Sequence, residues 1–182
     1  MKALIGKHIL RYAFGTFLAL SAGAANANTN PEGADPDPKG QSIMLALLLD
    51  TSNSMDGLID QAKSQLWRIV NELAQAKCGD GSKPDIRIAL YEYGNDRLPS
   101  SEGYIRLVSP LTSDLDLISE KLFGLTTNGG NEYCGYVIRT SLRQLDWSSS
   151  KADLKMIFIA GNEPFTQGEV PYRVACELAQ EK

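Results

Sequence analysis

The sequence is poor in the side chains that perform most covalent catalysis in proteins. Its 182 residues include one histidine, His8, and three cysteines, Cys78, Cys134 and Cys176. His8 lies in an N-terminal targeting segment, described below, so the chain after that segment has no histidine. This absence excludes Ser-His-Asp and Cys-His catalysis, and it also excludes a zinc site with histidine ligands.

The chain also lacks a cluster of basic residues. It has 18 Lys and Arg against 22 Asp and Glu, the net charge is -4, and the basic residues are scattered. Nucleic acid is therefore not expected as a partner, because proteins that bind it usually present a basic patch. Hydrophobic residues make up 43% of the chain, which is enough for one domain with its own core.

The N-terminus has the pattern of a secretory signal peptide. It opens with three positive charges, at Lys2, Lys7 and Arg11. An apolar stretch at 12–22 follows, and Ala25-Asn26-Ala27 has the form of a cleavage site. We therefore expect residues 1–27 to be removed, and the mature protein to be periplasmic or secreted with no membrane span. An uncleaved anchor is the alternative, which the short apolar stretch disfavours.

Three cysteines in an oxidising compartment predict one disulfide and one free thiol. The sequence does not rank the three possible pairings. Cys134 falls in the first turn of a predicted helix, where a thiol pKa can be lowered. A structural disulfide is favoured over a reactive thiol at this position.

The most informative stretch follows a segment rich in Pro and Gly, 28–42, which we interpret as a flexible leader. Residues 43–49 form an unbroken apolar run that suits a strand buried on both faces. The run stops at Asp50, and Ser52 and Ser54 follow at alternate positions. A strand that ends in this way presents three oxygen atoms at its carboxyl end, and hard divalent cations prefer oxygen ligands. The structural alternative is a strand-to-helix turn in which a serine caps the helix.

This stretch resembles the metal-ion-dependent adhesion site of von Willebrand factor type A (vWA) domains, in which Asp-x-Ser-x-Ser follows a hydrophobic strand. The matching residues are Asp50, Ser52 and Ser54. The resemblance covers 43–182 and implies an α/β, Rossmann-like, doubly wound sheet that is mostly parallel with one antiparallel edge strand. It also implies a site for Mg2+ (or Ca2+ or Mn2+) and a partner protein that supplies a carboxylate to the ion.

The rest of the chain shows alternating strand and helix patterns. Further strands are predicted at 85–93, 104–108 and 154–160, the first two as an edge hairpin that vWA domains also have. Helices are predicted at 56–77, 113–123, 132–145 and 170–182. Ser113 and Asp116 are spaced like a capping box. Since vWA domains usually continue with a further strand and helix, the resemblance implies that this sequence stops within its domain.

Two positions depart from the family pattern. Family members carry a Gly-Gly-Thr loop where this chain has Gly129-Gly130-Asn131, so Asn131 is the predicted fourth ligand. Thr126 and Thr127 are alternatives to Asn131, and an ordinary glycine turn is the structural alternative. The family also has Asp-Gly-Glu after the last of these strands, where this chain has Gly161-Asn162-Glu163. A carboxylate is therefore missing there, and Asn162 or Glu163 is left to compensate.

Three functions follow from these features. The first is a binding module in which a divalent cation is shared with a partner protein. The second is an aspartate-dependent phosphatase with Asp50 as nucleophile. The signature of such enzymes is a strand followed by Asp-x-Asp, in which the second Asp is the general acid/base. Ser52 occupies the position of that second Asp here and cannot perform its role. The third is a vWA-like scaffold whose metal site has decayed.

Overall fold

A computed structural model describes residues 42–79 and 81–182. The predicted signal peptide, 1–27, lies outside the described residues, as does the predicted leader, 28–42, except for Ser42. Ser42 already belongs to the first strand. No helix in the described part of the chain is both apolar enough and long enough to cross a membrane.

Four strands form one sheet in the order β3-β2-β1-β4. The inner strand β1 (Ser42–Asp50) pairs in parallel with β2 (Asp85–Tyr93) on one side and with β4 (Leu154–Ala160) on the other. The edge strand β3 (Ile105–Thr112) runs antiparallel to β2. The predicted fold class, with its single antiparallel edge strand, is confirmed. β3 is longer than the predicted 104–108.

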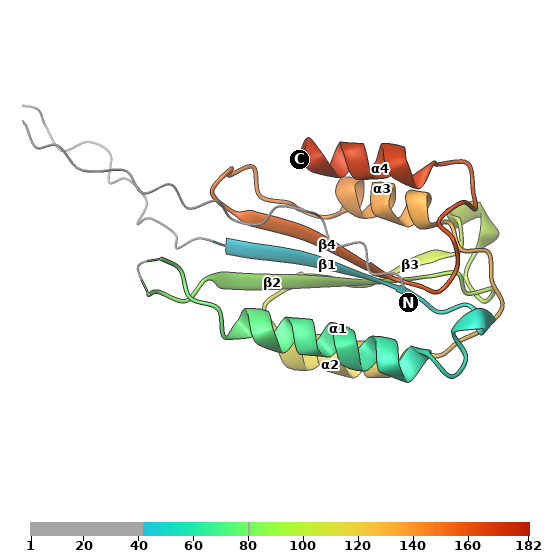
Figure 1. The fold of residues 1–182 in the computed structure, drawn as a ribbon, viewed down its shortest axis with the longest axis horizontal. Helices are drawn as coiled ribbons and strands as arrows, with labels where there is room; N and C mark the ends of the chain where they lie inside the picture. The colour runs from blue at the N-terminus through green and yellow to red at the C-terminus, as the bar shows by residue number, and fades with distance from the viewer. Residues whose placement is uncertain (1–41, 80) are drawn as a thin grey trace, which may run out of the picture. The chain divides into compact units, whose positions relative to one another are not determined.

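Helices cover both faces of this sheet (Figure 1). One layer contains α1 (Ile59–Ala74) and α2 (Leu115–Phe123), and the other contains α3 (Cys134–Gln144) and α4 (Tyr172–Gln180). Because side chains alternate along a strand, β1 serves both cores. Leu45, Leu47 and Leu49 pack in the α1–α2 core, whereas Ala46 and Leu48 pack in the α3–α4 core. This double burial explains why the strand is apolar throughout.

Two helix starts differ in detail from the prediction. A 3-10 turn, η1 (Asn53–Met55), follows the Asp50 loop, so α1 begins at Ile59 rather than at residue 56. A second 3-10 turn, η2 (Ser100–Glu102), precedes β3. The N-cap of α2 is Asp114, whose Oδ1 accepts a hydrogen bond from Leu117 N–H at 2.9 Å. The predicted capping box starting at Ser113 is therefore wrong by one residue.

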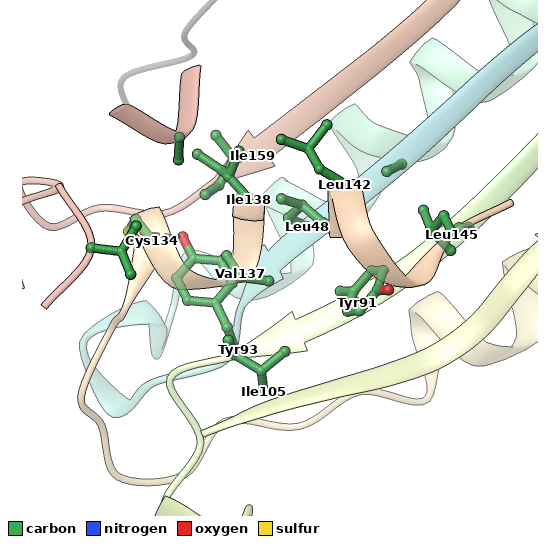
Figure 2. Packing of buried hydrophobic residues seen from close by; sticks show 14 residues of the cluster. Leu48, Tyr91, Tyr93, Ile105, Cys134, Val137, Ile138, Leu142, Leu145 and Ile159 are labelled. Atoms are coloured by element: carbon green, nitrogen blue, oxygen red, sulfur yellow. Dashed lines mark hydrogen bonds between the residues drawn. The ribbon is translucent and has the colours of Figure 1, made fainter. Parts of the chain in front are cut away.

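The predicted disulfide is not formed, since Cys78, Cys134 and Cys176 are all free thiols. Cys78 follows α1 on one side of the sheet, whereas Cys134 and Cys176 belong to the helices of the other side. The Cys134 side chain points to Tyr93, and its Sγ donates to Tyr93 Oη at 3.7 Å (Figure 2). Burial raises the pKa of Cys134 to about 12, so the lowered pKa considered from the sequence is also wrong.

Candidate metal centre

The carboxylate of Asp50 lies at the carboxyl end of β1 and is almost completely buried, with 1% of the residue exposed. Its Oδ1 accepts a hydrogen bond from the backbone N–H of Ser52 at 2.8 Å. Burial raises the pKa of Asp50 to about 6, with smaller contributions in the same direction from the charges of Glu132 and Glu163. Hydrogen bonds from Ser52 oppose this rise. Asp50 is thus a carboxylate held away from water at the end of the central strand.

The two serines of the predicted motif converge next to Asp50. Ser52 is buried, Ser54 is exposed in η1, and their Oγ atoms lie 2.9 Å apart. Asn162, from the loop after β4, orients the second serine. Its Oδ1 accepts a hydrogen bond from Ser54 Oγ at 3.0 Å, and its Nδ2 donates to Ser54 O at 2.9 Å. The loops after β1 and β4 therefore meet at the serine pair.

The glycine loop 129–131 brings Glu132, the neighbour of the predicted Asn131, beside Ser52. Asn131 is exposed, whereas Glu132 is 5% exposed. Gly130 has φ 150°, and a Cβ there would lie 2.5 Å from Ser52 Cβ and 2.9 Å from Glu132 Oε1. Only a glycine allows this approach, so the loop places the Glu132 carboxylate beside Ser52.

Of the two threonines considered as alternative ligands, Thr127 turns its hydroxyl to Asp56, and Thr126 is held through its backbone oxygen. Thr127 Oγ1 donates a short hydrogen bond to Asp56 Oδ1. The backbone oxygen of Thr126 accepts from Asn95 Nδ2 at 3.1 Å, and Asn95 Nδ2 also donates to Thr51 Oγ1 at 3.4 Å. These contacts tie the loop before Gly129 to the loop after β1.

Gly161 stands where the family pattern has a carboxylate, and the structure shows what surrounds it. A Cβ at this position would lie 2.7 Å from Tyr93 Oη and 3.1 Å from Asp50 Oδ2. Tyr93 Oη also donates to Ala160 O at 3.4 Å. The tyrosine therefore fills the space that a longer side chain at residue 161 would need. Glu132, rather than residue 161, provides a buried carboxylate beside Ser52.

The donor set is suited to a small divalent cation. Two ligands at about 2.1 Å from an ion and at right angles lie about 3 Å apart, which matches the serine Oγ atoms. The ion pairs among the described residues include neither Asp50 nor Glu132, so the two buried carboxylates have no basic partner there. Within the same residues no group of three Cys, His, Asp or Glu side chains forms a metal cluster, so a cation at this edge would need hydroxyl ligands as well.

Sequence reasoning named Asp50, Ser52 and Ser54, which the structure brings together, but it did not name Glu132, which lies beside them. The family pattern assigns the ligand to Asn131, because it follows the paired glycines directly. One signal was available in the sequence. Glu132 is an acidic residue that follows the paired glycines by two positions. It lies just before α3, whose first turn has no acidic residue.

Comparison of the sequence with protein families and with curated proteins finds no match. Comparison of the structure with solved structures does. Proximal thread matrix protein 1 from the mussel byssus aligns with a TM-score of 0.56 and 14% identity, over 78% of this chain and 36% of that protein. The VWA domain of SpRpn10 aligns with a TM-score of 0.51 and 16% identity, over 77% of this chain and 68% of that domain. This chain has the fold of a von Willebrand factor type A domain.

In a second structure of the mussel protein, the metal-ion-dependent adhesion site (MIDAS) motif is occupied by zinc. That structure aligns with a TM-score of 0.51 and 11% identity, over 78% of this chain and 34% of that protein. The vWF domain of the type V pilus tip protein Mfa5 from Porphyromonas gingivalis aligns with a TM-score of 0.47 and 20% identity, over 65% of this chain and 36% of that one. The chain thus spans about a third of the length of both proteins. At these identities the similarity establishes the vWA fold alone.

Proposed function

We propose that this chain is a protein-binding module that acts through a divalent cation, Mg2+ in the first instance or Ca2+ or Mn2+, held by Asp50, Ser52 and Ser54. The observation that carries the proposal is the pair of serine Oγ atoms 2.9 Å apart beside a buried Asp50 carboxylate. That arrangement supplies adjacent oxygen ligands and a negative charge from a single loop. Asn131 stays a predicted fourth ligand.

The exposed side of the site is open to a partner protein. The bound cation would supply a positive charge that attracts an oxygen donor of the partner. Asp50 and Ser52 are buried and fix one side of the site, whereas Ser54 is exposed. An incoming carboxylate from a partner protein therefore has access from the Ser54 side. The zinc-occupied MIDAS motif of the similarly folded mussel protein supports a cation at the corresponding edge of the sheet.

The test measures thermal unfolding with and without Mg2+ or Mn2+. We expect both ions to raise the unfolding temperature of the parent chain and to leave that of Asp50→Ala unchanged. Asp116→Ala is the matched control, because Asp116 is an exposed carboxylate on α2 and should keep the full response. Equal stabilisation of Asp50→Ala and the parent would reject a site at this loop. A flat calorimetric titration of the folded parent would instead support a scaffold with a decayed site.

We further propose that the domain works outside the cytoplasm, as the N-terminal charge and cleavage pattern predicts. Cell fractionation with N-terminal sequencing of the mature chain tests this proposal. A mature N-terminus after Ala27 in the periplasmic or secreted fraction is the expected result. Retention of Met1 in a cytoplasmic fraction would contradict it.

A further inference from the structure

We infer that Glu132 is a direct ligand of the same cation, so that the site takes carboxylates from two loops, Asp50 after β1 and Glu132 before α3. This inference rests on the proposed function, because it concerns the ion that Asp50, Ser52 and Ser54 would hold. It assigns the fourth oxygen ligand to a residue next to the predicted Asn131.

Three side chains converge because two glycines keep the space between them clear. A Cβ at Gly94 would lie 2.9 Å from Asp50 Oδ1, 3.2 Å from Glu132 Cγ and 3.4 Å from Ser52 Cβ. A Cβ at Gly130 would lie 2.5 Å from Ser52 Cβ and 2.9 Å from Glu132 Oε1. Asp50, Ser52 and Glu132 therefore meet at the Gly94 position, and Ser52 and Glu132 meet again at Gly130, although they come from loops about eighty residues apart in the sequence.

The Glu132 carboxylate is held in one orientation by Gln167, from the loop that follows β4. Gln167 Nε2 donates a short hydrogen bond to Glu132 Oε2, and Glu132 N–H donates to Gln167 Oε1 at 3.3 Å. This double contact uses Oε2 and leaves Oε1 as the oxygen on the side of Ser52. A second layer of hydrogen bonds that fixes the first ligands is a common feature of metal sites.

The charge balance points in the same direction. Glu132 is 5% exposed and Asp50 is 1% exposed, and each faces the other's negative charge. The ion pairs found in residues 42–79 and 81–182 give neither of them a basic partner. Two buried like charges are costly unless a cation lies between them. One divalent ion would balance both carboxylates.

The experiment is a calorimetric titration of the full chain with Mn2+ and, separately, with Mg2+. Glu132→Gln keeps the size of the side chain and its acceptor for Gln167 Nε2 but removes the charge. We expect this variant to bind both ions at least about tenfold more weakly. Glu181→Gln, the same substitution at an exposed glutamate at the C-cap of α4, is the matched control and should bind as the parent does.

Unfolding in EDTA gives a second readout that separates a ligand from a structural residue. Without metal, Glu132→Gln should unfold at the same or a higher temperature than the parent, because it removes a repulsion with Asp50. A merely structural role for Glu132 would instead lower the unfolding temperature and leave the ion affinity unchanged.

The outcomes distinguish the two proposals. If the parent binds an ion and Glu132→Gln binds it equally well, this inference is wrong and the proposed function stands. The inference is also wrong if Asn131→Ala loses affinity and Glu132→Gln does not. If the folded parent binds neither ion, both proposals are wrong.

Discussion

Asn162 holds Ser54 at two points, accepting from its hydroxyl and donating to its backbone oxygen, at 3.0 and 2.9 Å. The contact joins η1 to the loop after β4, 108 residues further along the chain. Asn162 follows Gly161, the position at which the family pattern has a carboxylate. The amide therefore orients Ser54, a proposed ligand, and adds no charge to the site.

We predict that Asn162→Ala weakens Mg2+ binding by about tenfold, because Ser54 Oγ loses the partner that orients it. The free energy of unfolding in EDTA should fall by only about 1 kcal/mol, as for the loss of a typical hydrogen bond. Asn71→Ala is the control, because Asn71 Nδ2 donates to Trp67 O within α1, away from the site. An Asn162→Ala variant that binds Mg2+ like the parent would remove Asn162 from the site.

The burial of Asp50 predicts a pH dependence of stability in the metal-free protein. Its folded pKa of about 6 lies above the unfolded value of 3.8, so the folded state binds the proton more tightly. The stabilising contribution is full below the unfolded pKa and is lost as the pH rises through the folded one. The difference corresponds to about 3 kcal/mol between these limits.

Urea unfolding in EDTA from about pH 4.5 to about pH 8 measures this contribution. Asp50→Asn, which cannot titrate, should gain in stability relative to the parent as the pH rises through about 6. Comparing the two proteins at each pH cancels the titration of the other carboxylates. A gap between them that stays constant over this range would show that Asp50 is not buried as described.

The strands could be predicted from the sequence because their apolar patterns are local. The run 43–49 is apolar throughout since β1 is buried on both faces, and the limits of β2 and β4 match the predicted 85–93 and 154–160. Helix starts were less predictable. Because η1 precedes α1, that helix starts later in the sequence than predicted. At α2, Asp114 rather than Ser113 accepts the capping hydrogen bond.

The site was only partly predictable for a related reason. Asp50, Ser52 and Ser54 are close in sequence and share one loop, so their spacing alone places them together. Glu132 reaches them through the backbone conformation of Gly130 and the contact with Gln167, neither of which leaves a local pattern. The cysteine count likewise says nothing about which side of the sheet each thiol occupies.

The cysteines give a prediction of their own. Cys134 is buried with a pKa of about 12, so at pH 8 its thiol stays protonated and shielded from reagents. In the native chain we expect a disulfide reagent such as DTNB to modify the half-buried Cys78 and Cys176 first and Cys134 only after unfolding. A Cys78→Ser, Cys176→Ser double variant isolates Cys134 for this measurement.

Unfolding the unreduced parent protein should release three reactive thiols, because all three cysteines are free in the structure. A count of one thiol before reduction would show a disulfide and would restore the expectation from the sequence. Fast native modification of Cys134 in the double variant would contradict its contact with Tyr93 Oη.

Alanine substitutions at Gly57 and Gly130 should have different effects on stability and on Mg2+ affinity. The first tests backbone strain alone, and the second also tests crowding at the site. Gly57 has φ 79° and nothing within 4 Å of a Cβ placed on it, so Gly57→Ala meets backbone strain alone. We expect this variant to lose about 1 kcal/mol of stability and to keep its Mg2+ affinity.

Gly130→Ala should behave differently, because its Cβ would overlap Ser52 Cβ at 2.5 Å and crowd Glu132 Oε1 and Gly94 O, each at 2.9 Å. Moving these groups apart should cost about 3 kcal/mol and abolish Mg2+ binding, since the displaced atoms belong to or support the donor set. Urea unfolding in EDTA and calorimetric titration measure the two effects on the same preparations. If Gly130→Ala kept its affinity while Gly57→Ala lost it, the cation would lie closer to η1 than to the glycine loop, and Glu132 would be too far away to act as a ligand.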